Sequence, residues 1–508
     1  MKIGRNDPCH CGSGKKYCLE KDEALEHEQA AQTEDTEFED DDDWHDEIND
    51  FDDEDFEIDE DEDFDEFDDD DEEDFDSDDD DNDDDDDELD GLEKVTPKRS
   101  PEVIAAQDAR WNEFEAADDE GRVALFLKTL EEPELMDDDL AFDMLDKICT
   151  ACLASGDRDR YDDLIKKLRE RLPEVYSESA HYHLENLITN AVVAGRWQDV
   201  RTFALEFADV ADREIDTFNN VISQLAYHGQ LQILLEITQR AWPKIKDSDE
   251  ITPWGIDEFV VQGADFVVFD YLTHGTDPRA DDPELQQRLA FFTKIQPQRF
   301  TEVFNIFIGR STRSWTMQDF DFKEHIQIVK NSKGKRRRQR HSPGKRNLDD
   351  LSYEFFRYLH QHENVSYPKA ELARYNIVEY LIKRYDGDLE EHESMLERAL
   401  RGNRPKPRIK RRPPENILCP DRETLDRYLA GLMHFLNPQY YEVAATFEMV
   451  PAWLRFLEMR ELIDHDLHRR TLLNLRELQE DVISLFESFR EDPALVEAMR
   501  NWNETILA

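Results

Sequence analysis

The chain lacks long apolar runs. No stretch of its 508 residues approaches the roughly 20 apolar residues that a membrane helix needs, and the N-terminus has no hydrophobic core of a signal peptide. We therefore expect a cytoplasmic protein in a reducing environment, where disulfides are rare. Of the six cysteines, Cys149, Cys152 and Cys419 are expected to be free thiols. Cys149 and Cys152 share one face of an apolar helical stretch, which favours a buried pair over a redox pair.

Recognisable catalytic motifs are also lacking. The chain contains no P-loop, no Gly-x-Ser-x-Gly, no His-Glu-x-x-His and no dinucleotide fingerprint. Two histidine pairs have spacings that a metal could use: His181 with His183, and His465 with His468 near Asp464. Neither pair has a full ligand set, and unligated histidines on helices are common. We therefore expect a protein that is not an enzyme, with an unfamiliar helical active site as an alternative.

Strand signals are scarce, with few alternating runs of Val, Ile and Thr. From Ser100 onward, apolar residues recur at steps of three and four, which is typical of amphipathic helices, so we expect an all-α fold. Gly156, Gly195 and Gly229 each separate two such helical stretches and lie 39 and 34 residues apart. Helical-hairpin repeats have this period, because one hairpin cannot bury its own apolar face. The pattern resembles irregular tetratricopeptide-type repeats in a solenoid-like body; an irregular helical bundle is the alternative.

The negative charge is concentrated in one tract. The chain has 124 acidic and 62 basic residues, and residues 34–90 hold 42 of the acidic ones and no Lys or Arg. Like-charge repulsion and the lack of aliphatic side chains predict that this tract is disordered. Seven Phe and Trp residues interrupt it and could hold a basic, partly apolar partner. A solubilising spacer is the other interpretation.

Two basic stretches interrupt the helical pattern. Residues 330–346 hold nine Lys or Arg, and residues 398–412 hold eight, with no acidic residue in either. Their Gly and Pro residues predict exposed loops. Such loops could contact the phosphates of a nucleic acid, through Arg336, Arg337, Arg338, Arg411 and Arg412. The acidic tract could instead fold back onto these loops, because tethering within one chain raises the effective concentration of the two segments.

The most specific pattern lies in residues 4–18. Cys9, Cys11 and Cys18 fall within ten residues, around a glycine-containing turn with Lys15 and Lys16 beside it. Thiolates are good Zn²⁺ ligands, and a Cys-x-Cys pair on a tight turn can place two sulfurs on one side of the metal. The sequence therefore predicts a small zinc knuckle.

Residues 4–17, GRNDPCHCGSGKKY, resemble the SEC-C motif, the zinc-binding tail of the SecA translocation ATPase. The usual form, GRNDPCPCGSGKKYKKCC, carries a second ligand pair after the tyrosine. Here Cys18 follows Tyr17 at once, as if three residues including one ligand were missing. A structural zinc site normally has four ligands. The fourth could be His27, His10, Glu20, a water or a second molecule, and a decayed site is the alternative.

The resemblance implies a role in protein binding. In SecA this module engages the SecB chaperone and ribosomes, so the expected partner is a chaperone, a translocation component or the ribosome, with Lys15 and Lys16 as the basic contact surface. We expect a zinc knuckle (1–22), a disordered acidic linker (23–99), a helical-repeat domain (100–320), a basic loop (321–349) and a C-terminal helical domain (350–508). The function predicted is that of a non-enzymatic adaptor. The alternative is a nucleic-acid or ribosome-associated protein that the acidic tract regulates.

Overall fold

The computed structural model describes residues 100–275, 277–292, 297–311, 313–323, 325–330, 336–389, 416–433, 437–489, 492–500 and 502. The expected zinc knuckle, the acidic linker and the second basic stretch lie outside these residues. Within the described part, the chain forms α-helices, two short 3₁₀ helices and one β-hairpin, which confirms the expected helical fold class. None of the helices in this part combines the length and apolarity of a membrane span.

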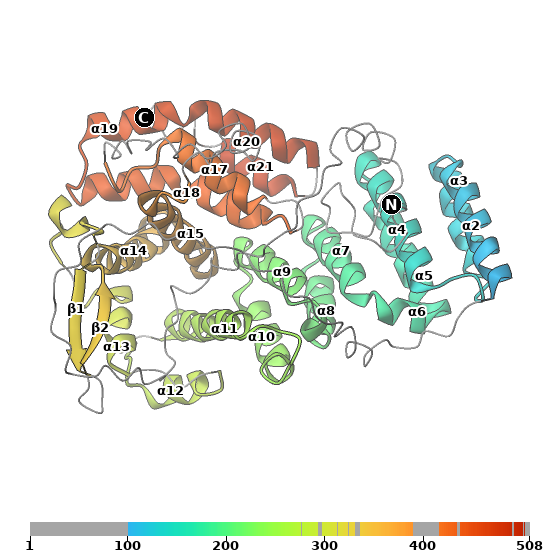
Figure 1. Ribbon diagram of the computed structural model, residues 1–508, viewed down its shortest axis with the longest axis horizontal. Helices are drawn as coiled ribbons and strands as arrows, with labels where there is room; N and C mark the ends of the chain where they lie inside the picture. Colours follow the sequence, from blue (N-terminus) through green and yellow to red (C-terminus); the bar gives the residue numbers. More distant parts are fainter. Residues whose placement is uncertain are drawn as a thin grey trace, which may run out of the picture. The chain divides into compact units, whose positions relative to one another are not determined.

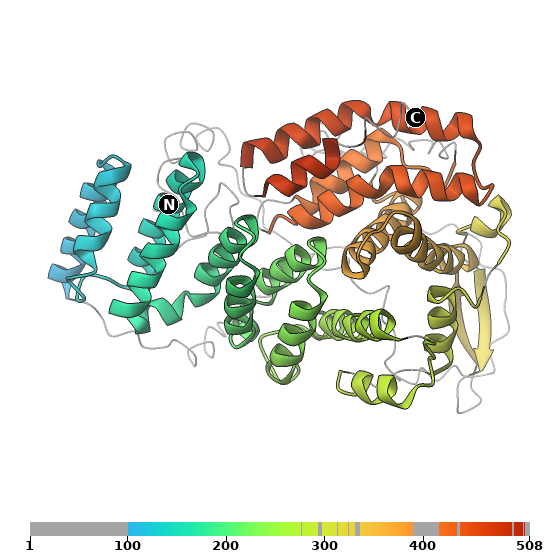
Figure 2. The same ribbon diagram turned by 180° about the vertical axis from the view of Figure 1, so that it is seen from behind.

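The helices of the first half follow one another with short connections. Their bounds are α2 Pro101–Glu115, α3 Asp119–Thr129, α4 Asp138–Ser155, α5 Arg158–Arg171, α6 Pro173–Glu178, α7 Ala180–Val193, α8 Trp197–Ala208, η2 Ala211–Arg213, α9 Ile215–Tyr227, α10 Leu231–Ile245, α11 Pro253–His274, α12 Pro283–Leu289, α13 Pro297–Phe307 and η3 Met317–Phe320. In Figures 1 and 2, α7, α8, α9 and α10 lie side by side, and successive members of this set contact one another.

The second half begins with the hairpin. Its elements are β1 His325–Lys330, β2 Arg336–His341, α14 Pro343–His362, α15 Tyr367–Asp386, α17 Arg422–Leu432, α18 Tyr440–Met459, α19 His465–Asn474, α20 Arg476–Phe489 and α21 Pro493–Arg500. Helix α18 packs against α14, α15, α17 and α21, so it is the central helix of this half (Figure 1).

The three glycines predicted from the sequence to mark helix–helix turns do so. Gly156, Gly195 and Gly229 adopt left-handed backbone conformations, with φ of 77°, 68° and 68°. In each turn the N–H of the next residue donates to the carbonyl five positions earlier: Asp157 to Cys152, Arg196 to Ala191 and Gln230 to Leu225, at 2.8–3.0 Å. This is the hydrogen-bond pattern of a glycine-terminated helix. The helix–turn–helix units are therefore confirmed, whereas their assignment to the tetratricopeptide type stays a prediction.

Neighbouring helical hairpins contact one another through both apolar and charged groups. Phe207, Phe218 and Phe259, from α8, α9 and α11, are fully buried, and each contributes roughly 1.5–3 kcal/mol through burial. Ion pairs join residues 35 to 40 positions apart, as in Glu120–Arg160 at 2.6 Å and Arg201–Glu236 at 2.6 Å. These exposed pairs contribute little, about 0–1 kcal/mol each, so the stacking depends on the apolar faces.

The turn at Gly229 differs from that at Gly195 in its surroundings. A Cβ at Gly229 would lie 2.7 Å from Oγ of Ser366, whereas a Cβ at Gly195 would meet nothing within 4 Å. Both positions carry the cost of a left-handed L-residue, about 1–2 kcal/mol. We expect Gly229→Ala to lower the free energy of unfolding by a further ~1–3 kcal/mol relative to Gly195→Ala, because of the clash. Urea unfolding of the two variants measures this difference.

A second substitution tests the cause. Ser366→Gly removes the side chain that the new Cβ would strike, and glycine at this N-terminal helix position costs only a few tenths of a kcal/mol. When combined with Gly229→Ala, Ser366→Gly should therefore restore most of the additional free energy of unfolding that Gly229→Ala loses relative to Gly195→Ala. Equal stabilities of the Gly195→Ala and Gly229→Ala variants would contradict the prediction.

The two expected helical domains share a core. Helix α9 of the first contacts α15 and α18 of the second, and the buried apolar side chains form one continuous cluster. Long-range hydrogen bonds reinforce the contact: the Gln224 amide donates to the Tyr441 hydroxyl at 2.5 Å, and the Tyr227 hydroxyl donates to Glu448 at 3.0 Å. The described residues from Pro101 onward accordingly form one compact unit.

The segment expected as a basic loop (321–349) contains regular structure. Strands β1 and β2 pair antiparallel, with His325 opposite His341 and Lys330 opposite Arg336. The composition of β1, HIQIVK, contains three β-branched residues that favour a strand, and its backbone groups find partners in β2 although β2 is rich in arginine. Helix α14 also begins inside this segment, with Pro343 in its first turn.

Candidate functional site

Most of the functional residues predicted from the sequence lie outside the described part. These are the metal ligands, the adjacent lysines and two of the arginines: Cys9, Cys11, Cys18, His27, Lys15, Lys16, Arg411 and Arg412. The other three arginines are placed. Arg336, Arg337 and Arg338 open β2, where they pair with Lys330, Val329 and Ile328 of β1.

An open cavity of about 600 Å³ lies where α9, α18 and α21 meet the segment from the end of α14 to the start of α15. Ligand pockets in proteins typically measure about 300–1,000 Å³. The polar lining comes from segments far apart in the sequence: Tyr227, His228, Glu363, Lys369, Glu448, Arg455, Glu497 and Trp502. The cavity therefore exists only because the two helical halves pack together, and no local sequence signal indicates it.

Four charged side chains of this cavity form two ion pairs, and the exposed Glu497 also lines it. Lys369 lies 2.8 Å from Glu448, and Nη2 of Arg455 lies 2.9 Å from Glu363. The Lys369 ammonium also lies 3.8 Å from the ring centroid of Tyr227. Burial first, and then the Glu448 carboxylate, raise the pKa of Tyr227, so its hydroxyl stays protonated and donates to that carboxylate.

Two residues that line the cavity each carry a buried hydrogen-bond donor with no acceptor among the described residues. The donors are the indole N–H of Trp502, whose residue is 3% exposed, and Nη1 of Arg455. The other donors of Arg455, Nε and Nη2, bind Glu363. A buried donor without an acceptor costs about 1–3 kcal/mol. Both donor atoms are covered by protein, so a ligand in the cavity would reach them only after the side chains around them moved.

A buried contact between a histidine and a carboxylate lies at the rim of the cavity. Nε2 of His228, in the Gly229 turn, lies 2.7 Å from the carboxylate of Asp492. Burial alone would raise the pKa of Asp492, but the hydrogen bond and charge of His228 lower it below its usual value. Asp492 also accepts a hydrogen bond from the N–H of Ala494 at the start of α21. The pair thus fixes α21 to the end of α9.

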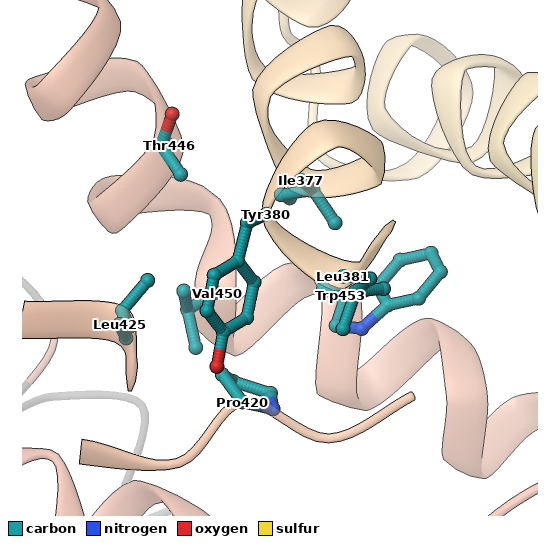
Figure 3. A pocket seen from close by; sticks show the side chains of 8 residues that line it. All are labelled: Ile377, Tyr380, Leu381, Pro420, Leu425, Thr446, Val450 and Trp453. Carbon is teal, nitrogen blue, oxygen red and sulfur yellow. The ribbon is translucent and has the colours of Figure 1, made fainter. Parts of the chain in front are cut away.

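A second, much smaller pocket is apolar. Figure 3 shows it between α15, α17 and α18, with the Tyr380 side chain in its centre. Its volume is about 10 Å³, which is at most room for one water, so it is a packing defect and not a ligand site. The residues that line it are Ile377, Tyr380, Leu381, Pro420, Leu425, Thr446, Val450 and Trp453.

The two histidine pairs noted in the sequence have different environments. His181 and His183 lie in α7, where burial lowers the pKa of each to about 4, so both are neutral at pH 7. In the described residues they belong to no group of three possible metal ligands. His465 and His468 do belong to one, and the third member is Glu458.

Asp464, which the sequence places beside His465, is not the third member of this group. Its carboxylate accepts a hydrogen bond from the N–H of Leu467 at 2.7 Å and thereby caps α19. Glu458, from the last turn of α18, faces the two histidines instead. A hydrogen bond with His468 is the main cause that lowers the pKa of Glu458.

The cysteine predictions for the body are confirmed. Cys149, Cys152 and Cys419 are buried thiols and are not joined in disulfides. Burial is the main cause that raises the pKa of Cys152, which disfavours the thiolate that redox chemistry needs. The Cys149–Cys152 pair is therefore part of the core of α4.

The buried histidines predict a loss of stability in acid. A neutral imidazole whose folded pKa lies near 4, below its ordinary value of 6.5, stabilises the fold fully above pH 6.5 and progressively less as the pH falls toward 4. We expect His183→Gln to remove this pH dependence. Between pH 7.5 and 5, the free energy of unfolding should therefore fall by about 2 kcal/mol less in the variant than in the parent. Urea unfolding at a series of pH values measures it; parallel curves for the two proteins would contradict it.

The comparison with protein families identifies one module. The SEC-C motif matches residues 5–17. No curated protein and no solved structure matches the chain. The chain therefore carries an N-terminal SEC-C motif, in a sequence whose described part is a helical body.

Proposed function

We propose that this chain is a non-enzymatic, zinc-binding interaction protein of the cytoplasm. The match of residues 5–17 to the SEC-C motif carries the proposal, because that motif is generally a zinc-binding module of the type found in SecA. Cys9, Cys11 and Cys18 supply three thiolate ligands, and His27 is the fourth. Zinc has a structural role here, and it orders the module that carries Lys15 and Lys16.

The helical body supplies a second contact for a protein partner, which is a chaperone, a translocation component or the ribosome. The cavity of about 600 Å³ is large enough for a short peptide segment. Trp502 and Arg455, which line it, each carry a buried donor without an acceptor among the described residues, and these donors would suit the carbonyl or carboxylate oxygens of a segment that displaced the side chains covering them. Lys369 with Glu448 and Arg455 with Glu363 form ion pairs in its lining, which favours binding over proton transfer by these four groups.

The zinc content of the purified, reduced protein tests the first part of the proposal. The full chain should retain a zinc ion that is lost in a Cys9→Ser, Cys11→Ser double variant. Cobalt substitution should show a thiolate-to-metal charge-transfer band in the parent alone. A parent chain without that band would mean that the three-residue gap has destroyed the site.

Peptide arrays test the second part. Trp502→Phe keeps an aromatic ring beside Phe447, where the two rings stack with centroids 4.4 Å apart, but it removes the indole N–H of a residue that lines the cavity. We expect the binding of captured peptides to weaken severalfold. Trp254→Phe is the matched control, because Trp254 is 62% exposed on α11 and does not line the cavity. Equal binding by the two variants would exclude the cavity as the peptide site.

Nucleic-acid binding is the second candidate function. The observation that favours it is β2, in which four of six residues are arginine and the backbone is held in an antiparallel pair. Replacing Arg336, Arg337 and Arg338 by Gln should weaken RNA or DNA binding. It should also reduce the slope of the logarithm of the binding constant against the logarithm of the salt concentration by up to about three. Deletion of residues 34–90 should strengthen binding if the acidic tract shields these residues. Absence of RNA or DNA binding by the parent chain would exclude this function, and binding that neither change affects would exclude β2 as the interface.

A further inference from the structure

We propose that Glu458, His465 and His468 form a second metal site, at the junction of α18 and α19, that binds Zn²⁺ or a chemically similar divalent ion. The site is separate from the SEC-C motif and uses no thiolate. Nδ1 of His465 lies 3.1 Å from one carboxylate oxygen of Glu458, and Nδ1 of His468 lies 2.5 Å from the other. Ligand atoms of all three residues lie within 4.8 Å of one another.

The turn between the helices brings the three side chains together. Helix α18 ends with a hydrogen bond from the N–H of Leu462 to the carbonyl of Leu457 at 3.0 Å, and Glu461 takes a left-handed conformation with φ of 58°. Leu462 and Ile463 are buried directly after this turn, which anchors it to the core. Helix α19 then begins beside the last turn of α18. The positions of the three candidate ligands therefore depend on a packed turn and not on a mobile loop.

The two histidines are placed on one face of α19. They are three residues apart, so their side chains are neighbours on the helix surface. His468 is mostly buried, with 13% of its side chain exposed, whereas His465 is 78% exposed. One ligand is thus held rigidly, and the other faces the solvent from which the ion arrives.

The local charge favours a cation. The segment 458–468 contains four acidic residues and one basic residue, Arg460. The charge of Arg460 is engaged by Glu354, a buried carboxylate on α14. The N-terminus of α19 opposes a cation through its dipole, but Asp464 and Asp466 lie in that first turn and offset it. Arg469 and Arg470, which follow, are exposed.

The ligand set indicates the class of metal. Two imidazole nitrogens and one carboxylate oxygen are a typical protein contribution to an open zinc site, where water completes the coordination. Imidazole also suits cobalt, nickel and copper, whereas calcium and magnesium prefer oxygen ligands alone. A bound ion would replace the direct contacts between the carboxylate and the two imidazoles and would join α18 to α19.

The test uses the full chain with Cys9, Cys11 and Cys18 all replaced by Ser, so that the SEC-C thiolates cannot bind metal. Titration with Zn²⁺ in excess Mg²⁺, which occupies weak carboxylate sites such as those of the acidic tract, should show one zinc per chain. Co²⁺ should give visible absorption bands without a thiolate charge-transfer band. The thermal midpoint should rise with zinc, because the ion binds the folded state.

Three substitutions in this background locate the site. His465→Ala, His468→Ala and Glu458→Gln should each weaken zinc binding more than about tenfold, since loss of even a residue that only supports a metal ligand costs about 10–100-fold. His362→Ala, an exposed histidine at the end of α14, is the matched control and should have no effect. Equal thermal midpoints in EDTA show that the variants remain folded.

Either of two results would overturn the proposal: no zinc bound by the thiolate-free chain, or binding that all three substitutions leave unchanged. The latter would place the ion elsewhere, for example on the acidic tract. The outcome is independent of the N-terminal zinc site. That site is reported by the thiolate-to-cobalt band of the parent chain, which substitutions at Glu458, His465 and His468 should not alter.

Discussion

Replacing Arg384 by methionine is expected to lower the free energy of unfolding by about 3–5 kcal/mol, the range found when one partner of a buried charged network is removed. Arg384 is 8% exposed, near the end of α15. Its guanidinium donates to the carbonyls of Ile417 at 2.5 Å, Asn416 at 3.2 Å and Cys419, and it lies 3.3 Å from the carboxylate of Asp421. One side chain thus satisfies several acceptors of a segment that has little backbone pairing of its own.

Methionine preserves most of the aliphatic volume but supplies no donor. The carbonyls of Ile417 and Cys419 would lose this donor, and that of Asn416 would keep the N–H of Cys419 at 3.3 Å. Each carbonyl that stays buried without a donor costs about 1–3 kcal/mol. Lys383→Met is the matched control, because Lys383 is adjacent on α15 but has 45% of its side chain exposed; its ammonium pairs with Glu379 and lies 5.9 Å from the ring centroid of Tyr428. Urea unfolding of the two variants gives the comparison. If the free energies of unfolding of the Arg384→Met and Lys383→Met variants differ by less than about 1 kcal/mol, the hydrogen bonds of Arg384 do not stabilise the fold as described.

Replacing Trp453 by alanine is expected to lower the free energy of unfolding by about 3–5 kcal/mol, which is the second large effect. Trp453 is 1% exposed, in the middle of α18, and its ring meets that of Phe355 edge to face with centroids 5.0 Å apart. Its indole N–H donates to the carbonyl of Leu418 at 2.8 Å, in the segment that Arg384 also holds. Since the site already borders the small apolar pocket of Figure 3, alanine would leave a larger void there.

Trp453→Phe separates the two contributions. It retains a ring against Phe355 but leaves the Leu418 carbonyl without the indole donor. We therefore expect the free energy of unfolding to fall by a smaller amount, about 1–3 kcal/mol. Thermal and urea unfolding of both variants measure the difference. Because Arg384 and Trp453 hold the same segment, their effects should be non-additive when combined. Strict additivity would mean that the segment is not a shared element.

The sequence predicts the helical repeats well because their signals are local. A glycine between two apolar helical stretches needs only its own backbone freedom and one turn of neighbours, so Gly156, Gly195 and Gly229 were identifiable without any tertiary information. The buried Cys149–Cys152 pair follows from the same local periodicity. The sequence did not predict the β-hairpin, because β2 is rich in arginine and has no β-branched residues, so only β1 carries a strand signal.

The candidate sites show the limit of such reasoning. The spacing of His465 and His468 is visible in the sequence, but Glu458 joins them only through the left-handed turn at Glu461, and the nearer Asp464 caps a helix instead. Nothing local distinguishes Glu458 from the many other acidic residues of this chain. The same applies to the cavity, whose lining spans Tyr227 to Trp502.

The sequence by itself determined the SEC-C motif, the segregation of charge and the helical class, because a ligand spacing, a composition and a periodicity are each properties of a short stretch of chain. Only the tertiary structure decided that the two helical halves share one core, that a cavity forms between them, and that His465 and His468 face a carboxylate. These features depend on which apolar faces pack together, and that choice is made by contacts between residues up to 264 positions apart, as in the His228–Asp492 pair.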